Sequence, residues 1–164
     1  TERGKGLAVY EGFKMASGDL IGFTDADNSI PPREFYKLVK SINSHDGAIA
    51  SRGLFREHAI NYQSSFIRRV FSFSLSFFFV RLLYGLPIKD SQCGAKVFKR
   101  EPLLRIIPEL KLMNSYFDVE LLYEFSKIGS IKEVPIKWVD KAGGHFSWKE
   151  IVTGTLSLIK ARFS

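Results

Sequence analysis

The sequence predicts an α/β fold with a mixed, mostly parallel sheet flanked by helices. Two observations predict it: helical and strand patterns alternate along the first part of the chain, and the strand candidates are short apolar runs. A length of 164 residues and a hydrophobic content of 45% suit one domain with a buried core. We therefore expect residues 1–164 to form a single unit.

The first elements are predicted in the order helix, strand, helix, strand. Residues 6–17 have a helical pattern, and the apolar run Leu20–Thr24 follows as a strand. The next helix begins at Pro31-Pro32, because proline is favoured in a first helical turn and apolar residues follow at helical spacing. Residues 48–51 then form a short buried strand. This alternation favours parallel strands.

Residues 62–84 fit two patterns. Phenylalanines alternate with serines as in a strand, while other apolar residues keep helical spacing, and the length of the segment favours a helix. Arginines flank its phenylalanine-rich body, as in helices that lie at a bilayer interface. We therefore predict a membrane surface as a partner, and a core helix with solvated ends is the alternative interpretation.

The second half of the chain continues with a polar loop at 89–93 and a predicted strand at 94–98. A helix at 117–125 and a strand at 131–139, interrupted by Pro135, come next. An amphipathic helix over 148–163 closes the chain.

Composition limits the classes of function. The net charge of +7 favours anionic partners, which include nucleic acid, an acidic membrane surface and phosphorylated small molecules. A single cysteine, Cys93, rules out an internal disulfide framework, and the three histidines lack zinc-ligand spacing. The longest uncharged stretch near the aromatic cluster, 70–80, is shorter than the ~20 residues that span a bilayer.

The strongest candidate site is Asp25-Ala26-Asp27, directly after the strand Leu20–Thr24. It places two carboxylates at the carboxyl end of a strand, where α/β sheets usually bind ligands. A divalent cation and a phosphorylated substrate could meet there. An Asp-rich turn would give the same pattern, because Asp and Asn favour turns.

Six short motifs occur in a fixed order, and together they carry a family resemblance. They are Gly-Lys-Gly at 4–6, Asp-Ala-Asp at 25–27, Ser-Arg-Gly at 51–53, Arg-Arg at 68–69, Asp-Ser-Gln-Cys-Gly-Ala-Lys at 90–96 and Phe-Asp-Val-Glu-Leu at 117–121. In this order the chain resembles the polyprenyl-phosphate glycosyltransferases of the inverting type-A class, which contains dolichyl-phosphate glucosyl- and mannosyltransferases. The 90–96 motif looks more like the glucosyl branch.

The resemblance implies a nucleotide-binding α/β sandwich. In that family the first strands bind the nucleoside, and they precede the position that matches Thr1. We therefore expect this chain to be the carboxyl-terminal portion of a glycosyltransferase catalytic domain.

The resemblance also implies a metal site. Asp25 and Asp27 would hold Mg²⁺ or Mn²⁺, which neutralises the departing nucleoside diphosphate. In the mannosyl members a third ligand stands two residues further on, at the position of Ser29. Lys5 matches a loop near the nucleotide, with a solvated turn as the other interpretation.

The acceptor implied by the resemblance is a polyprenyl phosphate. A phosphate monoester has a second pKa near 6, so it is largely dianionic at neutral pH and attacks without a general base. Arginines suit the gathering of two anionic reactants because guanidinium forks match phosphate oxygens. We expect Arg52 to contact phosphate, and Arg69 rather than Arg68 to face the site, because neighbours on a helix point to different sides.

Further residues are assigned by the same resemblance. Asp90 and Gln92 belong to a loop that borders sugar and acceptor, although a polar loop at a strand end gives the same pattern. Asp118 is expected to face the site in place of Glu120, because residues two apart on a helix diverge. Lys141 matches a basic residue near the end of the family's sequences.

The leading hypothesis is metal-dependent, inverting transfer of glucose from UDP-glucose to a polyprenyl phosphate at the cytoplasmic face of a membrane, the endoplasmic reticulum in a eukaryote. Mannosyl transfer from GDP-mannose is the nearest alternative. A non-catalytic module that binds membrane surfaces or nucleic acid is another. The sequence argues against nucleic acid, because most phenylalanines have core spacing and no known nucleic-acid motif occurs.

Overall fold

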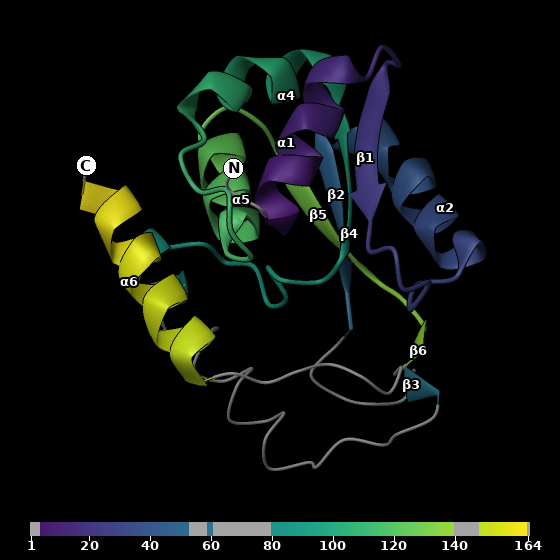
Figure 1. The fold of residues 1–164 in the computed structure, drawn as a ribbon. Helices are drawn as coiled ribbons and strands as arrows, with labels where there is room; N and C mark the ends of the chain where they lie inside the picture. The colour runs from purple at the N-terminus through teal and green to yellow at the C-terminus, as the bar shows by residue number, and fades with distance from the viewer. Residues whose placement is uncertain (1–3, 53–58, 61–79, 140–147, 164) are drawn as a thin grey trace.

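The computed structural model describes residues 4–52, 59–60, 80–139 and 148–163 (Figure 1). Its helices are α1 (Lys5–Met15), α2 (Pro32–Ser41), α4 (Arg100–Ile106), α5 (Phe117–Ser126) and α6 (Trp148–Phe163), with 3₁₀ turns at Ile42–Ser44 and Ile107–Glu109. Its strands are β1 (Leu20–Thr24), β2 (Gly47–Ser51), β3 (Ala59–Ile60), β4 (Ala95–Lys99), β5 (Ile131–Pro135) and β6 (Trp138–Val139).

The main sheet has four strands in the order β1-β4-β2-β5. Strand β4 is antiparallel to β1 and β2, and β2 is parallel to β5. Three strands therefore run in one direction, and the predicted mixed α/β architecture is confirmed. The expected mostly parallel pairing is not observed in this sheet, because β4 lies between β1 and β2 and runs against both. Strands β3 and β6 form a separate parallel pair.

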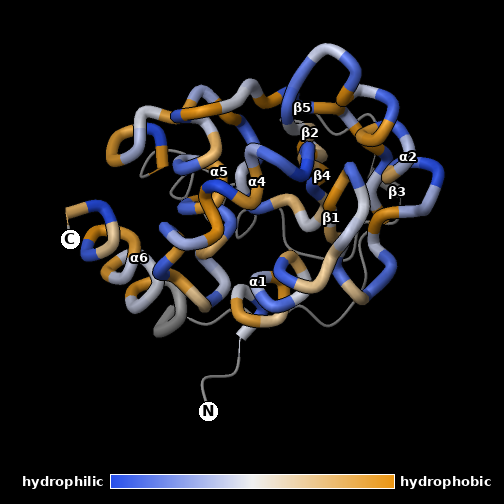
Figure 2. Tube along the Cα trace, turned by 90° about the horizontal axis from the view of Figure 1, so that it is seen from above, coloured by the Kyte–Doolittle hydropathy of each residue, from blue (hydrophilic) through white to orange (hydrophobic). Residues whose placement is uncertain are grey.

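Helices cover both faces of the main sheet, and its central strands β2 and β4 are buried on two sides (Figures 1 and 2). On one face, Ile49 and Phe98 pack in a core shared with α1, α4 and α5. On the other, Ala50 and Val97 pack with Leu38 of α2. Successive strand residues point to opposite faces, which is why the uninterrupted apolar run of β2 suits this three-layer arrangement.

The element predictions hold where the sequence signal was long or sharply bounded. The bounds of β1 and α6 are as predicted, and α1 and α5 differ by one or two residues at their ends. The predicted strand at 131–139 is divided at Pro135 into β5 and β6. Helix α4 was not predicted, because its seven residues are too few to show helical periodicity.

The predicted aromatic-rich helix at 62–84 lies mostly outside the described residues. Its last part, 80–84, is helical and packs in the core through Val80 and Tyr84. The Tyr84 hydroxyl donates to the Leu158 carbonyl at 2.8 Å, which joins this segment to α6. Among the helices of the described ranges, none is both long and apolar enough to cross a membrane.

Candidate active site

The turn after β1 carries Asp25 beside the loop that leads into β4. The main-chain N–H of Asp25 donates to the Gly94 carbonyl at 2.8 Å, because β1 and β4 are antiparallel and Thr24 pairs with Ala95. A Cβ atom at Gly94 would overlap the Asp25 carboxylate. Glycine at this position of the 90–96 motif therefore makes room for the Asp25 side chain.

The rest of the turn positions Asp27. Asn28 has a φ of 56°, a left-handed conformation that Asn tolerates. The Ser29 N–H donates to Oδ1 of Asp27 at 2.9 Å, and the Ser29 carbonyl accepts from Val139 N–H at 2.9 Å. Asp27 is exposed, whereas Ser29 is 4% exposed. The two carboxylates thus follow β1 at an accessible position, and Ser29 is buried in the same turn.

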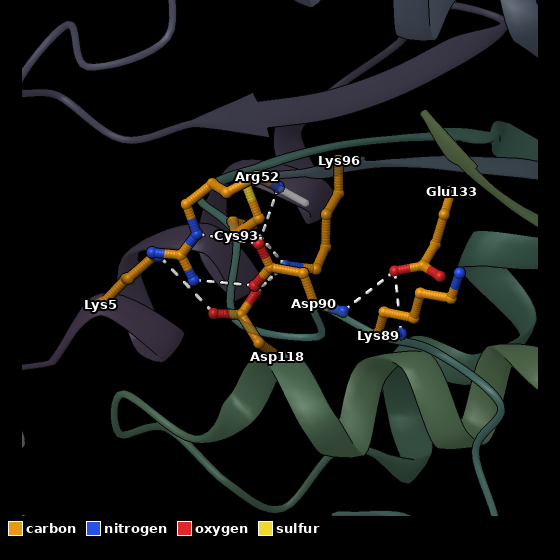
Figure 3. A network of polar contacts seen from close by, with 8 residues as sticks. All are labelled: Lys5, Arg52, Lys89, Asp90, Cys93, Lys96, Asp118 and Glu133. Atoms are coloured by element: carbon orange, nitrogen blue, oxygen red, sulfur yellow. Dashed lines mark hydrogen bonds and ion pairs between the residues drawn. The ribbon is translucent and has the colours of Figure 1, made fainter. Parts of the chain in front are cut away.

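A cluster of two lysines and two aspartates, which we call the charge cluster, lies behind this turn. It contains Lys5, Asp25, Lys96 and Asp118, all but Asp25 drawn in Figure 3. Nζ of Lys5 is 2.7 Å from Oδ1 of Asp25 and 3.5 Å from Oδ2 of Asp118. Nζ of Lys96 is 2.5 Å from Oδ1 of Asp118. Burial opposes the charged form of Lys5, but Asp118 and Asp25 outweigh it and raise the pKa of Lys5.

Lys96 is a site residue that the sequence reasoning missed. It is fully buried and donates to the Cys93 carbonyl at 2.8 Å in addition to its ion pair with Asp118. Alternation along β4 places Lys96 on the same face as Phe98, the face that α5 covers. Lysine is almost never fully buried unless it is paired. A lysine between Ala95 and Val97 in an apolar strand was the signal that could have found it.

Arg52 and Asp90 form a second ion pair where β2 ends. Nε and Nη2 of Arg52 donate to the two carboxylate oxygens of Asp90 at 2.8 and 2.7 Å, and the Arg52 main-chain N–H adds a third bond at 2.9 Å. Burial raises the pKa of Asp90, but Arg52 outweighs it, so that pKa is lowered. The Lys89 and Asp90 N–H groups both donate to Glu133 at 2.9 Å, which ties the loop to β5 (Figure 3).

The two ion-pair groups act on each other electrostatically. Burial disfavours the charged form of Arg52, but Asp90 outweighs it, and Asp25 adds a smaller contribution that also raises the pKa of Arg52. The carboxyl ends of β1 and β2 and the loop before β4 therefore bring cations and carboxylates to one edge of the sheet.

The other predicted site residues are placed as follows. Asp118 belongs to the charge cluster, whereas the carboxylate of Glu120 accepts the Lys111 and Leu112 N–H groups at 2.9 and 2.7 Å. Gln92 is half-buried in the loop before β4. Arg69 and Lys141 lie outside the described residues.

Cys93 is packed inside the same loop. It is 1% exposed, and burial, with a smaller contribution from Asp90, raises the pKa of its thiol to about 11. A thiol in this state is inert as a nucleophile at neutral pH.

The donor set at the turn fits a divalent cation that a substrate helps to bind. Asp25 and Asp27 offer carboxylate oxygens, the ligands that Mg²⁺ and Mn²⁺ prefer. The ammonium of Lys5 contacts Asp25 at 2.7 Å, so this carboxylate accepts a positively charged partner. No group of three or more His, Cys, Asp or Glu suited to a metal occurs within the described ranges. Mg²⁺ commonly uses one or two carboxylates together with substrate phosphates, so two acids suffice.

Solved structures with the same architecture are glycosyltransferases. Glucosyl-3-phosphoglycerate synthase from Mycobacterium tuberculosis, in complex with uridine diphosphate, matches with a TM-score of 0.62 and 19% identity over 99% of this chain and 55% of that chain. Mannosyl-3-phosphoglycerate synthase from Rubrobacter xylanophilus matches with a TM-score of 0.62 and 16% identity over 97% and 49%. The fold is therefore that of the type-A glycosyltransferases.

Residues 1–107 match the family described as Glycosyl transferase family 2, and the chain belongs to that family. It is 33% identical over 147 residues to the dolichyl-phosphate beta-glucosyltransferase of Dictyostelium discoideum, covering 86% of this chain and 45% of the relative. It is 33% identical over 162 residues to the enzyme of that name from Homo sapiens, covering 91% and 49%. The predicted resemblance is confirmed, and the chain spans about half the length of the curated relatives it matches.

Proposed function

We propose that the protein containing this chain transfers glucose from UDP-glucose to a polyprenyl phosphate with inversion, using Mg²⁺ or Mn²⁺ held by Asp25 and Asp27. The observation that carries the proposal is the contact of Lys5 with the accessible Asp25, at the same end of the sheet as the Arg52–Asp90 pair. The names of the relatives support the glucosyl and dolichyl-phosphate parts. A fold neighbour has been solved with Mn²⁺ and UDP-glucose, which supports the donor and the metal.

The metal would be bound by Asp25 and Asp27, with Ser29 in the same turn as a weaker oxygen donor. When bound, it would withdraw negative charge from the departing diphosphate. Lys5 adds a positive charge near Asp25. The turn itself holds Asp27 through the Ser29 N–H, so a carboxylate oxygen is oriented before any ligand arrives.

Arg52 would bind a phosphate group of the acceptor. Asp90 accepts hydrogen bonds from Nε and Nη2, which fixes the plane of the guanidinium, and the Arg52 side chain is 34% exposed. Asp90 is 3% exposed, so its role in this proposal is to position Arg52. Gln92 belongs to the same loop and would border the sugar.

The nucleophile is the acceptor itself. The phosphate of a polyprenyl phosphate is largely dianionic at neutral pH, so the chain needs to supply positive charge and no general base. Arg69 and Lys141 are proposed to add cations for phosphate. Asp118 would have an indirect role, because it contacts Lys5 and so helps to position that ammonium. Because the acceptor is a lipid, we place the reaction at a membrane surface, on its cytoplasmic face.

The test is an extraction assay on the full-length protein. Radiolabelled UDP-glucose is incubated with a polyprenyl phosphate and Mg²⁺ or Mn²⁺, and counts in the organic phase are measured. We expect counts with metal and none with excess chelator. A parallel reaction with labelled GDP-mannose distinguishes the donors. Counts from GDP-mannose alone would mean that the donor is GDP-mannose and not UDP-glucose. No counts from either donor would contradict the proposed function.

A further inference from the structure

The side chain of Lys5 joins an accessible carboxylate to a buried one. Its Nζ is 2.7 Å from Asp25, whose side chain is 38% exposed, and 3.5 Å from Asp118, whose side chain is 2% exposed. The closer contact is with the residue proposed to bind a divalent cation. A lysine ammonium therefore occupies part of the surface that the metal would use.

The backbone beneath Lys5 has little freedom. The Leu7 N–H donates to the Met113 carbonyl at 3.1 Å, and a Cβ atom at Gly6 would come within 2.7 Å of the Met113 carbonyl carbon. The start of α1 thus lies against the 113–114 segment with no space for a side chain at Gly6. Any change in the partner of Lys5 has to come from rotation of its own side chain.

Asp118 is a fixed alternative partner. Lys96, fully buried, holds its Oδ1 at 2.5 Å, while Oδ2 is the atom nearest Lys5. Two lysines and two aspartates leave the charge cluster neutral. A divalent ion bound to Asp25 would add two positive charges beside Lys5 and repel its ammonium. After Lys5 leaves Asp25, Asp118 would still offer it Oδ2, while Oδ1 stays with Lys96.

We infer that Lys5 is the resident counter-ion of Asp25, which a divalent cation displaces and which Asp118 then retains. The inference rests on the proposed metal role of Asp25. Lys5 competes with the metal for one carboxylate, and the Lys96–Asp118 pair provides the place to which its charge moves. Metal affinity is thereby set in part by a residue outside the metal's ligands.

The test is a Mn²⁺ titration of the full-length protein without nucleotide or acceptor, with free Mn²⁺ measured by electron paramagnetic resonance. Lys5→Met should bind Mn²⁺ about fivefold more tightly than wild type, because a partly exposed competing ion pair is removed. Lys5→Gln, which keeps a polar end group, should show the same shift. The matched control is Lys14→Met on the same helix, which removes an exposed pair with Glu11 and a contact with the Tyr10 ring and should leave the affinity unchanged.

Asp25→Asn separates this inference from the proposed function. Weaker binding in Asp25→Asn together with tighter binding in both Lys5 variants supports the inference. If Asp25→Asn weakens binding while both Lys5 variants match wild type, competition is overturned and the metal site stands. If Asp25→Asn binds Mn²⁺ as tightly as wild type, or no variant binds it, the metal role is overturned and the inference with it.

Discussion

Two pairs of acids separated by one residue occupy different settings in this chain. Asp25 and Asp27 follow a strand in a turn, where the Asp25 side chain is 38% exposed and Asp27 is exposed. Asp118 and Glu120 stand in the first turn of α5 and are 1% and 4% exposed. The spacing is identical, and the solvent contact is opposite.

The partners differ as well. Within α5, Asp118 meets Lys96 while Glu120 caps the N–H groups of Lys111 and Leu112, since helical residues two apart point to different sides. In the turn, the Ser29 N–H donates to Asp27, while Lys5 contacts Asp25. The element that carries an acid pair therefore decides whether it can share one ligand or divides into two structural contacts.

The largest expected effect on activity comes from Asp25 and Asp27, the acid pair in the turn after β1. Asp27→Asn should lower the proposed glucosyl transfer by about 10²- to 10³-fold, because the amide loses the charge that is proposed to hold the metal. Stability should hardly change, because the amide oxygen still accepts the Ser29 N–H. The extraction assay and thermal unfolding measure the two effects. The control is Asp19→Asn, an exposed acid before β1, and a comparable loss of activity there would contradict the assignment.

Substitution of Asp118, in the acid pair of helix α5, should lower the free energy of unfolding. Asp118→Asn leaves Lys96 buried beside a neutral amide, and breaking a buried ion pair costs ~3 kcal/mol of unfolding free energy. Urea unfolding of the variant measures it. The double variant Lys96→Met with Asp118→Leu should regain much of the loss, since an apolar pair needs no counter-charge. Equal destabilisation in the single and double variants would mean that lost packing, and not an unpaired charge, causes the loss of stability.

The Arg52–Asp90 pair is intermediate between the exposed turn acids and the buried helix acids. Its Arg52 is partly exposed and is proposed to contact phosphate, while Asp90 is buried. Arg52→Lys should lower transfer about tenfold, since lysine keeps the charge and loses the two-pronged contact with Asp90. Arg105→Lys, in an exposed pair with Glu101, is the matched control and should have wild-type activity. Activity at the wild-type rate in Arg52→Lys would argue against phosphate contact.

Much of this architecture could be predicted because its signals are local. The run Leu20–Thr24 and the helix Trp148–Phe163 have clear apolar patterns and sharp ends, and their bounds match the structure. Asp25 was recognisable because it directly follows a strand. The position of β4 was not predictable in this way, since strand order depends on contacts between residues far apart in sequence.

The charge cluster shows the same limit. The sequence marks Lys5, Asp25 and Asp118 as candidates, but no local pattern brings them together. Lys96 lies within the predicted strand 94–98 and was missed because a strand prediction does not say which side chain a charged residue meets; alternation along β4 turns this lysine toward α5. Pairing across the fold converts an unremarkable lysine into the anchor of Asp118.

The smallest effect concerns Glu120, the acid of the helix pair without a lysine partner in the charge cluster. Burial, opposed by the Leu112 and Lys111 N–H groups and reinforced by Glu124, raises its pKa. The folded chain then binds this proton more tightly than the unfolded chain. Its contribution to stability is present below the ordinary pKa of 4.5 and is lost as the pH rises through the raised pKa.

Glu120→Gln removes that dependence and keeps an oxygen that can accept both N–H groups. The variant should gain stability relative to wild type as the pH rises from 4 to 7, by less than about 1 kcal/mol. Urea unfolding at several pH values measures this, with Glu109→Gln as an exposed control. If the free energy of unfolding of wild type instead rises relative to that of Glu120→Gln as the pH rises, the fold stabilises the ionised carboxylate of Glu120. Glu120 would then resemble Asp118, whose ionised form is paired with Lys96.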